Sequence, residues 1–459
     1  MVEFLESVNR FIWGVPALVM ILGVGLFLTI RTNFAQFSLF PKAFRTFFRQ
    51  FKKRDTLQKE PSPYQALCTA LAATVGTGNL AGVAGAISIG GPGAIFWMWI
   101  CGLLGMVTKY AEAVLSVRYR QRNSDGEYVG GPMYMIQNGL GYKRKWLASI
   151  YCFFAVVASF GVGNATQINA VIGGVNSAIS ALGGEESFVG NLIMGVLLAI
   201  AVLGMLMGGA SRIGAIAEKL VPFAAAAYLL LGTIVLIGHV QMIPAAIVSI
   251  IQGAISPRAV TGGMLGSAFT ALRVGASRGV FTNEAGMGTA AIAHGSACVN
   301  HPVEQGLMGI MEVFWDTIVI CTMTALVILC SGVSIPYGTD PGINLTTQAF
   351  SAVFGDWVCI PIALFLCCFA IATVLGWGLY GARCAQYLFG EHAWKRFVYI
   401  QAGTVLIGAV LGTSTVWMLS EIVNGLMAIP NLIALALLST ELAKLTSEFA
   451  SNNRIPKPI

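Results

Sequence analysis

The chain has 459 residues, of which 56% are hydrophobic and only 10% are charged. With a mean hydropathy of +0.76, this composition predicts an all-α integral membrane protein and excludes a protein built around a soluble core. The net charge of +7 does not indicate nucleic-acid binding, because the basic residues gather in alternate loops between apolar segments, as they do in multi-pass membrane proteins.

The first apolar segment, 15–30, is followed by a strongly basic loop at 31–63. By the positive-inside rule this loop is cytoplasmic, which places the N-terminus outside. The middle of the loop, 37–51, carries phenylalanine, lysine and arginine at helical spacing. This spacing predicts an amphipathic helix on the inner membrane face, and an ordinary solvated linker is the competing interpretation.

The second apolar segment, 64–89, is long enough to cross a bilayer, yet its centre is small and polar. Residues 72–82 read Ala-Ala-Thr-Val-Gly-Thr-Gly-Asn-Leu-Ala-Gly. An unpaired backbone group in lipid costs several kcal/mol, so a spanning helix loosens only beside a protein-lined or watery cavity, where its freed groups can hold ions. Close helix packing is the alternative, because Gly78 and Gly82 fit a G-x-x-x-G pattern.

Further apolar segments follow at 94–117, 147–176, 191–207 and 215–237. In the first of these, Lys109 and Glu112 stand three positions apart, and we expect them to form a pair at the surface. The second contains a cluster of polar residues, namely Asn164, Thr166, Gln167 and Asn169. Polar groups inside a span face a cavity or a neighbouring helix more often than lipid.

A second unusual stretch, 262–296, holds many glycines together with Arg273, Arg278 and Glu284. A continuous lipid-facing helix would not hold these residues, so the pattern predicts a second discontinuous helix. A soluble loop between two shorter spans is the alternative, but it would break the inside–outside order of every later loop. The last apolar segments lie at 307–329, 353–383, 397–411 and 416–438, which brings the total to about eleven.

Without the first segment, the remaining spans divide into two sets of five, and each set opens with a discontinuous helix. An odd number of spans in each set inverts the second set relative to the first. Interrupted helices at matching positions of two inverted halves are typical of a secondary transporter's binding site. The predicted units are an N-terminal segment at 1–63, inverted repeats at 64–238 and 239–445, and a cytoplasmic tail at 446–459.

Four motifs give the chain a resemblance to a known family: Gly76-Thr77-Gly78-Asn79, the turn Gly90-Gly91-Pro92-Gly93 with Ala94-Ile95-Phe96-Trp97-Met98-Trp99 after it, Gly130-Gly131-Pro132-Met133-Tyr134, and Asn283-Glu284-Ala285-Gly286-Met287-Gly288. Together they resemble the alanine/glycine:cation symporter family over nearly the whole chain. The resemblance implies the leucine-transporter-like fold, with five-plus-five inverted repeats. It also implies sodium-driven uptake of alanine, glycine or a similar small neutral amino acid.

An amino acid zwitterion needs an anion site, a cation site and a pocket for its side chain. The unwound N–H groups of Thr77 and Gly78, at a half-helix N-terminus, suit the substrate carboxylate. Glycine at this point also allows the ligand to approach the backbone closely. The substrate amine needs acceptors, and we expect the Gln167 side chain to be one of them.

The second discontinuous segment is expected to complete the pocket. Its freed carbonyls between 269 and 275, including those near Thr270 and Gly275, would accept from the substrate amine. Phe269 and Trp377 are expected to wall the pocket and so restrict it to a small side chain. Ordinary helix packing is the alternative role for both aromatic residues.

Sodium prefers oxygen ligands, and the resemblance implies one ion between segments 64–89 and 353–383. The expected ligands are the backbone carbonyls of Ala72, Val75 and Ala370 and the hydroxyl of Thr373. The alternative for Thr373 is a hydroxyl bonded to its own helix backbone. Asn79 either holds a second sodium ion near the substrate carboxylate or caps the half-helix.

Neither the core of segment 64–89 nor the middle of segment 353–383 contains a carboxylate. This favours sodium over proton coupling, because a proton carrier needs a titratable group at its site. Glu284, Glu312 and Asp316 keep proton coupling as the alternative. Arg273 and Arg278 either form gates with such carboxylates or make plain structural pairs.

The ten cysteines form no C-x-x-C motif and lie almost all within apolar runs, so we expect free thiols. No metal motif or nucleophile–base pair is found, so we expect no enzyme and no cofactor, with sodium as the coupling ion. The predicted protein is a monomer in the bacterial or archaeal cell membrane, with a cytoplasmic C-terminus and no nucleic-acid partner. A glutamine- or serine-preferring symporter is the alternative, and a channel or a membrane-embedded enzyme is a more distant one.

Overall fold

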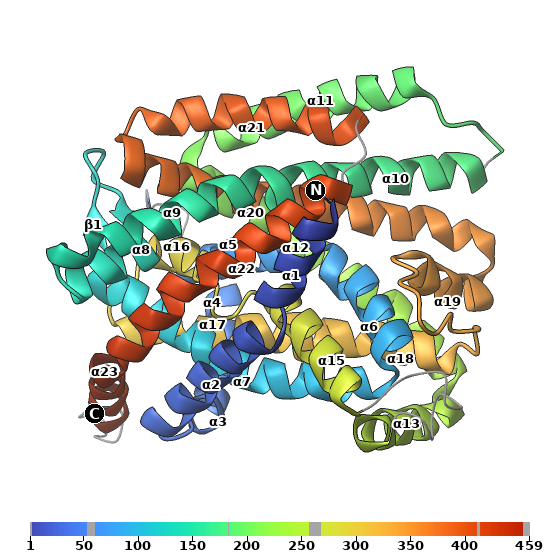
Figure 1. Ribbon diagram of the computed structural model, residues 1–459, viewed down its shortest axis with the longest axis horizontal. Helices are drawn as coiled ribbons and strands as arrows, with labels where there is room; N and C mark the ends of the chain where they lie inside the picture. The colour runs from blue at the N-terminus through green and yellow to red at the C-terminus, as the bar shows by residue number, and fades with distance from the viewer. Residues whose placement is uncertain (1, 53–59, 182, 257–267, 411–413, 453–459) are drawn as a thin grey trace.

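The computed structural model describes residues 2–52, 60–181, 183–256, 268–410 and 414–452, and most of these residues are helical (Figure 1). The helices of the first half are α1 (Val2–Ile12), α2 (Val15–Arg31), α3 (Ala35–Ser38), α4 (Phe40–Lys52), α5 (Pro63–Thr74), α6 (Val83–Gly90), α7 (Gly93–Tyr119), α8 (Pro132–Tyr134), α9 (Lys145–Phe160), α10 (Thr166–Ala181), α11 (Phe188–Leu206), α12 (Gly209–Gly238) and α13 (Ile243–Ile255). Those of the second half are α15 (Ala268–Asn283), α16 (Thr289–Gly295), α17 (Pro302–Val313), α18 (Thr322–Cys330), α19 (Asn344–Phe354), α20 (Cys359–Phe389), α21 (Ala393–Val410), α22 (Ser414–Leu437) and α23 (Ser439–Asn452).

Short irregular elements join or interrupt these helices. The π-helical segments are η1 (Gly78–Gly82), η2 (Met135–Gly139), η4 (Gly161–Ala165) and η6 (Phe314–Cys321), and the 3-10 turns are η3 (Tyr142–Arg144), η5 (Val240–Met242) and η7 (Asp356–Val358). Two short strands, β1 (Gln121–Arg122) and β2 (Tyr128–Val129), form an antiparallel pair with Gln121 opposite Val129.

Within the described residues, six helices are long and apolar enough to cross a membrane, and two bent helix pairs raise this number to eight if each counts as one span. A multi-pass helical membrane protein is therefore confirmed, whereas the predicted count of about eleven spans is not. The difference arises where spans are short or interrupted, since α2 has 17 residues and α16 has seven. The six spans are Gly93–Tyr119, Tyr142–Ser180, Phe188–Leu206, Gly209–Gly238, Pro302–Cys330 and Asp356–Phe389.

The first predicted discontinuous helix is broken at its glycines. α5 begins with a capping box in which Ser62 and Gln65 exchange hydrogen bonds, and it ends at Thr74, after which Val75 is extended. The helix that resumes at Gly78 makes an angle of 54° with α5. Two half-helices thus meet within one apolar segment, as the sequence predicts.

The second discontinuous helix is also confirmed, and its break lies near the end of the predicted stretch. α15 is continuous to Asn283, and the chain then takes left-handed conformations at Glu284, Gly286 and Gly288 before α16 begins. Glycine adopts such conformations without steric cost, which explains its repetition here. Residues 282–290 are all buried, so the soluble-loop alternative is wrong. The expected start of the segment, at 262–267, lies outside the described residues.

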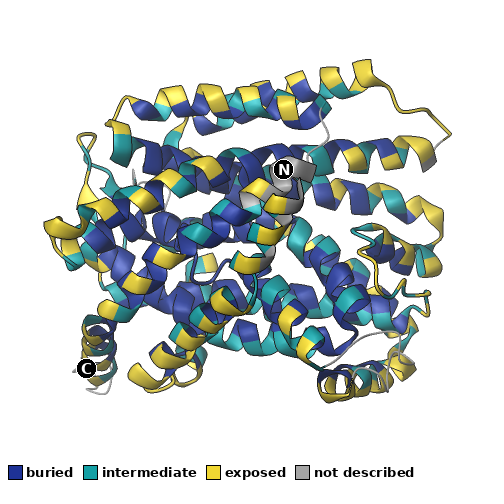
Figure 2. Cartoon of the chain, viewed as in Figure 1, coloured by how far each residue is buried: buried dark blue, intermediate teal, exposed yellow. Residues whose placement is uncertain are grey.

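The two broken helices pack against each other in opposite directions (Figure 1). The first half of the second helix, α15, contacts the second half of the first, α6, while α16 contacts α5. This antiparallel arrangement is what inverted repeats require. Where they cross, a Cβ added to Gly78 would lie 3.4 Å from Thr282 Oγ1. Figure 2 shows that buried residues concentrate in the middle of the molecule, around this crossing.

Two long segments support the crossing from the side. One comprises α9, η4 and α10, and the other is α20, and both pack against each other while α20 also packs against α5. Glycines permit the close contacts: a Cβ on Gly163 would lie 2.3 Å from Trp377 Cβ, and one on Gly376 would lie 2.8 Å from Ala73 Cβ. These segments carry Gln167, Thr373 and Trp377 to the breaks.

Helices outside the predicted spans complete the fold. α4 confirms the helix expected within the basic loop, and α13, α19 and α23 were not predicted. All ten cysteines are free, as expected. The proposed division into units at 63/64, 238/239 and 445/446 remains a prediction, and α23 runs across the last of these boundaries.

Candidate functional site

A small cavity lies where the two broken helices meet. Its volume is about 20 Å³, which is room for about one water molecule. The cavity therefore accepts only a small ligand unless the surrounding helices move. Its lining comes from α5, η1, η4, α10, α15, α20 and α22, and comprises Ala73, Thr74, Gly76, Thr77, Gly78, Val162, Gln167, Phe281, Glu284, Thr373, Trp377 and Asn424.

The cavity brings together many of the residues expected at the site. Thr77 and Gly78 come from the first break, Gln167 from α10, and Thr373 and Trp377 from α20. These segments are far apart in the sequence, so their convergence is a property of the fold. The binding role of each residue remains a prediction.

The first break presents backbone donors to the cavity. The N–H group of Gly76 donates to Asn79 Oδ1 at 2.8 Å. The N–H groups of Thr77 and Gly78 have no hydrogen-bond acceptor within the described part of the chain. Free N–H groups at the start of a helix form an anion site, because they add to the positive end of the helix dipole.

Asn79 itself does not line the cavity. Its Oδ1 accepts from Gly76, and its Nδ2 donates to Asp316 Oδ1 at 2.8 Å. This geometry favours Asn79 as the cap of the half-helix. A second sodium ion at Asn79 remains a prediction. Asp316 is held in turn by Thr317, whose Oγ1 donates to Asp316 Oδ2 at 2.8 Å, so this carboxylate stabilises the cap from the neighbouring helix.

The expected sodium ligands lie at the crossing of α5 and α20. A Cβ added to Gly76 would lie 3.0 Å from Thr373 Oγ1, which places the break directly beside this hydroxyl. The last carbonyls of α5 lose their helical partners because the helix ends at Thr74. Ala72, Val75 and Ala370 are all buried here. This donor set of carbonyl and hydroxyl oxygens fits a hard cation such as sodium.

Two of these expected ligands also take part in helix hydrogen bonds. Thr373 Oγ1 donates to the carbonyl of Phe369 at 3.0 Å, which is the local bond weighed as its alternative role. The hydroxyl oxygen keeps its lone pairs for a cation while it donates. Ala370 lies in the continuous helix α20. Its carbonyl oxygen would therefore have to accept a helical hydrogen bond and contact the ion at the same time.

Two buried amide oxygens at the cavity have no hydrogen-bond partner among the described residues. Gln167 Nε2 donates to the carbonyl of Val162 at 3.1 Å, while Gln167 Oε1 is unpaired. Asn424 Oδ1 is likewise buried and unpaired. A buried acceptor without a donor is costly, so these two oxygens favour a ligand with several donors, such as an ammonium group. Asn424 was missed in the sequence; its only signal is a polar residue inside an apolar segment.

The rest of the polar cluster on the Gln167 segment faces a neighbouring helix. Asn164 Nδ2 donates to the carbonyl of Gln401 on α21 at 2.7 Å, and Asn169 Nδ2 donates to that of Gly408 at 3.5 Å. Thr166 bonds to its own helix. Within this cluster, Gln167 lines the cavity, whereas Asn164 and Asn169 contact a neighbouring helix.

Glu284 contributes a carboxylate to the cavity wall. It is 4% exposed and adopts a left-handed φ of 52°. Its Oε1 accepts from Trp377 Nε1 at 3.1 Å, and its Oε2 accepts from Thr289 Oγ1 at 2.6 Å. The sequence suggested Glu284 for proton coupling or for a gate with an arginine, and the structure shows that it also fixes the indole of Trp377 at the cavity.

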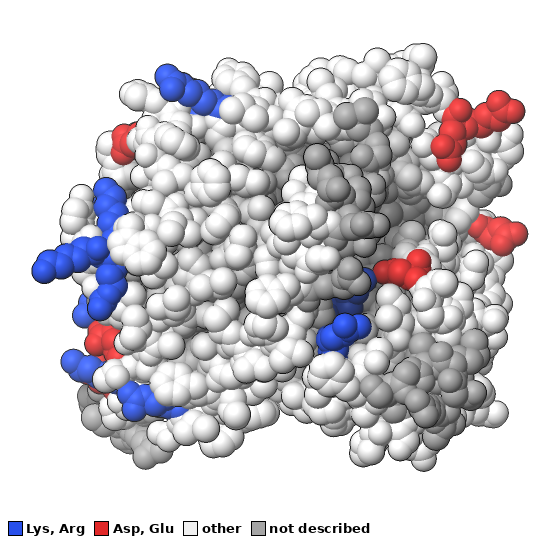
Figure 3. All heavy atoms as spheres, in the orientation of Figure 1, with Lys and Arg blue, Asp and Glu red and all other residues white. Residues whose placement is uncertain are grey.

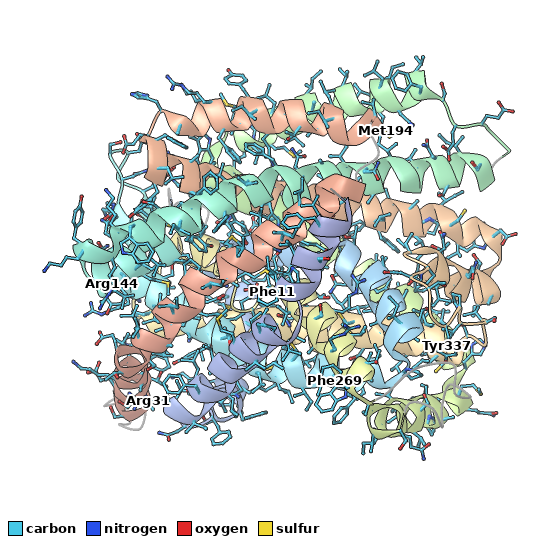
Figure 4. All side chains as sticks on the ribbon, in the orientation of Figure 1. Phe11, Arg31, Arg144, Met194, Phe269 and Tyr337 are labelled. Carbon is cyan, nitrogen blue, oxygen red and sulfur yellow. The ribbon has the colours of Figure 1, made fainter. Side chains whose placement is uncertain are left out.

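Three residues expected in the pocket lie elsewhere. Phe269 is 55% exposed and lies toward the lower edge of the bundle in Figure 4, and neither Thr270 nor Gly275 lines the cavity. The expectation of freed carbonyls at 269–275 is wrong, because α15 is continuous there. Gly275 instead packs on α7, where an added Cβ would lie 2.2 Å from the carbonyl oxygen of Ala94. The aromatic wall from this helix is Phe281.

The expected surface pair of Lys109 and Glu112 is also wrong. Lys109 Nζ lies 3.0 Å from Glu312 Oε1, and both side chains are buried. Glu312 Oε2 is 2.9 Å from His294 Nε2. Glu112 Oε1 instead accepts from the N–H groups of Gly286 and Gly288 at the second break. Buried charges need partners, and the fold supplies these from other helices.

Arg278 of α15 forms an ion pair with a residue in the loop between α18 and α19. Arg278 pairs with Asp340 at 3.0 Å, and Asp340 also lies against α6, where an added Cβ on Gly85 would be 2.8 Å from Asp340 Oδ1. Of the two roles considered for Arg278, this pair favours the structural one, and no ion pair with Glu284, Glu312 or Asp316 is found within the described residues. Arg273 and Arg278 border a separate hollow of about 290 Å³ on the other side of Phe281.

Comparison with known proteins shows which family the chain resembles over its length. Residues 1–457 match the sodium:alanine symporter family. The chain is 41% identical over 452 residues to the sodium/alanine symporter AgcS of Methanococcus maripaludis, covering 98% of this chain and 97% of AgcS. It is 34% identical to the probable sodium/glutamine symporter GlnT of Bacillus subtilis, covering 94% of this chain and 87% of GlnT.

A solved structure shares the fold. The crystal structure of MhsT in complex with L-phenylalanine superposes with a TM-score of 0.59 at 13% identity, covering 85% of this chain and 96% of MhsT. At this identity the likeness shows the fold alone. The family match over nearly the whole chain, together with relatives aligned over almost their full lengths, leads to one conclusion: the chain belongs to the sodium:alanine symporter family and is a multi-pass membrane transporter.

Proposed function

We propose that the protein couples inward sodium movement to the uptake of a small neutral amino acid, alanine or glycine first, by alternating access. One observation carries the proposal: the cavity offers free N–H donors at Thr77 and Gly78 and unpaired acceptors at Gln167 and Asn424. This is the complement of a zwitterion, with its carboxylate toward the first break and its ammonium toward the amide oxygens.

The walls of the cavity favour a small side chain. Phe281 and Trp377 bound it on two sides, and Glu284 holds the indole in place through a 3.1 Å hydrogen bond. With a volume of about 20 Å³, the cavity must widen even for alanine, so binding and helix movement are linked. The relative named for glutamine keeps a larger neutral amino acid as the alternative substrate.

Sodium would bind where α5 ends beside α20, with the carbonyls of Ala72, Val75 and Ala370 and the hydroxyl of Thr373 as ligands. The ion would order the end of α5, and the same break holds the substrate carboxylate through Thr77 and Gly78. Each ligand then raises the affinity for the other by the same coupling free energy, typically about 1–3 kcal/mol. Rocking of the broken helices against their supporting segments would open the site to the other side.

Proton coupling is a second candidate, because Glu284 places a carboxylate at the cavity wall. In that case Glu284 would exchange a proton during each cycle, and the carbonyl site beside Thr373 would have no role in energising transport. The two candidates differ in which gradient drives uptake.

The charge distribution supports an orientation in a bacterial or archaeal cell membrane. Figure 3 shows basic side chains along the left edge of the visible face and acidic ones along the right edge. The left edge carries the β1 hairpin and α23 in Figure 1, and the right edge carries the connection between α10 and α11. By the positive-inside rule the left edge, where the C-terminus lies in Figure 1, faces the cytoplasm. An N-terminus on the outside remains the expectation from the basic loop at 31–63. We expect a monomer.

The test is uptake of labelled alanine into proteoliposomes under an inward sodium gradient, compared with an equal choline gradient at fixed pH. Uptake that requires sodium supports the proposal. Uptake that is indifferent to sodium but follows a pH gradient would replace it with proton coupling through Glu284. If neither gradient drives alanine uptake, labelled glutamine and serine decide whether the substrate assignment is at fault.

A further inference from the structure

Phe281 separates the cavity at the two breaks from a larger hollow. The hollow has a volume of about 290 Å³ and lies between α1, α6, α15 and α22. Among the described residues, Phe281 is the only one that lines both spaces. The cavity itself measures about 20 Å³, so the room into which the Phe281 ring can move lies on the side of the hollow.

The position of Phe281 in the chain favours such a movement. α15 ends at Asn283, two residues after Phe281, and Glu284 then takes a left-handed φ of 52°. Hinges lie at a few loop or element-terminal residues that absorb changes of φ and ψ. The second break is therefore the point at which the end of α15 can move and carry the half-buried Phe281 ring with it.

Trp13, at the end of α1, contacts the ring of Phe281. The two ring centroids lie 6.5 Å apart with an interplanar angle of 71°, which is an edge-to-face arrangement. Aromatic pairs at this distance and angle attract each other beyond the effect of simple burial. Because Trp13 also lines the hollow, its indole stands on the side toward which the Phe281 ring would move.

The indole of Trp13 is itself fixed on α22. α1 packs on α22 (Figure 1), and Trp13 Nε1 donates to the carbonyl oxygen of Glu421 at 2.8 Å. Asn9 Nδ2 donates to Glu421 Oε2 at 2.7 Å. Gly425 allows this close approach, since an added Cβ would lie 2.4 Å from Ile12 Cγ2 and 3.3 Å from Trp13 Nε1. α22 thus holds Trp13 from outside the two broken helices.

We propose that Phe281 is a gate between the cavity and the hollow, and that Trp13 is the positioning residue that keeps this gate closed. The hydrogen bond to Glu421 anchors the indole, and the contact with Phe281 stabilises the phenyl ring where it separates the two spaces. α1 precedes both predicted repeats, so a segment outside them controls access to the cavity. That an amino acid passes this gate rests on the proposed function, whereas the contact between the two rings does not.

The test measures the reactivity of a cysteine placed at the cavity. Val162 lines the cavity but not the hollow, and Val162→Cys is introduced into the full-length protein, purified in detergent. Mass spectrometry follows its reaction with a small, positively charged methanethiosulfonate reagent, and the protein without this substitution gives the background of its ten native cysteines. With Trp13→Leu, which removes the ring pair, we expect the introduced cysteine to react about two- to tenfold faster.

Further variants separate the gate from general loosening. Trp13→Phe keeps a ring toward Phe281 but loses the donor to Glu421, so it should react more slowly than Trp13→Leu. Phe281→Leu should raise the rate by itself, and Trp13→Leu should then add nothing, because Trp13 acts through Phe281. Trp99→Leu is the matched control: Trp99 Nε1 also donates a hydrogen bond, to Thr322 Oγ1 at 2.8 Å, but Trp99 lines neither space, so the rate should not change.

An unchanged rate in Trp13→Leu would overturn the proposal. An equal acceleration by Trp13→Leu with and without Phe281→Leu would also overturn it, because Trp13 would then act only on the packing of α1. Alanine with sodium should protect Val162→Cys from the reagent. If protection is absent while Trp13 and Phe281 remain coupled, the proposed substrate is wrong and the gate is supported.

Discussion

The two broken helices open their backbones in the same way but satisfy them differently. At the first break, Asn79 caps Gly76, and the N–H groups of Thr77 and Gly78 stay free beside the cavity. At the second break, Glu112 Oε1 accepts from the N–H groups of Gly286 and Gly288, at 2.9 and 3.1 Å. A carboxylate of the protein thus occupies at the second break the position that the proposed function gives to the substrate carboxylate at the first.

This difference shows how an inverted repeat can keep one site rather than two. Glu112 belongs to α7, and Asn431 of α22 ties the same carboxylate to the break by donating to Glu112 Oε1 at 2.8 Å and to the carbonyl of Gly286 at 2.9 Å. The second break is thus a fixed joint within the protein. In the proposed function, the first break is the one that depends on a ligand.

The sharpest way to break this comparison is to remove the internal carboxylate. Glu112→Ala leaves the N–H groups of Gly286 and Gly288 without their acceptor, and each unsatisfied buried donor costs about 1–3 kcal/mol. For these two donors we expect a loss of about 2–6 kcal/mol in the free energy of unfolding, seen as a large fall in the unfolding temperature in detergent. Glu112→Gln keeps one oxygen acceptor and should lose less. Unfolding of Glu112→Ala at the unmodified temperature would contradict the fixed joint.

An alanine substitution for one glycine at each break compares the stability cost at a glycine with positive φ and close contacts with the cost at a helical glycine with open space around it. Gly288 has a φ of 78°, and an added Cβ would lie 2.4 Å from Pro132 Cγ, so Gly288→Ala should lose about 2 kcal/mol of stability. Gly82 at the first break has a helical conformation and no atom within 4 Å of an added Cβ. Gly82→Ala should leave the unfolding temperature within a few degrees of the original. Equal losses in the two variants would remove the distinction.

The ligand-dependent character of the first break can be tested through the substrate amine. Gln167 Oε1 is buried without a donor, and a hydrogen bond to a charged group contributes about 1.5–3 kcal/mol. Gln167→Ala should therefore raise the KM for alanine by about tenfold or more while the unfolding temperature stays nearly constant. Gln167→Glu keeps the acceptor and should restore part of the affinity. Unchanged affinity and selectivity in Gln167→Ala would show that the amine binds elsewhere.

A smaller effect is expected on the sodium side of the same break. Thr373→Ala removes one of four expected oxygen ligands, and the loss of about 1 kcal/mol corresponds to about a fivefold higher sodium concentration for half-maximal uptake. Thr373→Ser retains the hydroxyl and should behave like the unmodified protein. A sodium dependence that is identical in Thr373→Ala would place the ion at another site.

The smallest effect is expected on α15, where the structure corrects the sequence. Phe269 is exposed and outside the cavity, so Phe269→Ala should leave the KM for alanine within about twofold of the original, as is usual for an exposed position. Phe281→Ala, on the same helix but at the cavity wall, should raise the KM and admit larger neutral amino acids in competition assays. A strong defect in Phe269→Ala with a neutral Phe281→Ala would reverse this assignment.

The sequence by itself determined that the chain is a membrane protein with two interrupted helices. Both features are local, because lipid forbids a loosened backbone and because glycines and charges therefore mark where a span is broken. The residues of the first break, Thr77 and Gly78, follow directly from that argument, and the structure places both at the cavity.

The location of the second break within its stretch depended on neighbouring helices. Gly275 and Gly279 lie within the continuous helix α15, where α7 approaches so closely that a side chain would not fit. A Cβ added to Gly275 would lie 2.2 Å from the Ala94 carbonyl oxygen, and one added to Gly279 would lie 3.0 Å from Cys101 Cβ. Gly286 and Gly288 are glycines because of their positive φ. A sequence shows glycine in both cases, and only the tertiary contacts separate the two reasons.

The pairing of buried charges was likewise decided by the tertiary structure. The spacing of Lys109 and Glu112 on one helix predicted a pair, yet Lys109 lies 3.0 Å from Glu312 on α17 and Glu112 binds the second break. Helical spacing states which groups can meet on a surface. In a buried interior every charge must find a partner or desolvation will oppose it, and those partners come from segments that only the fold brings together.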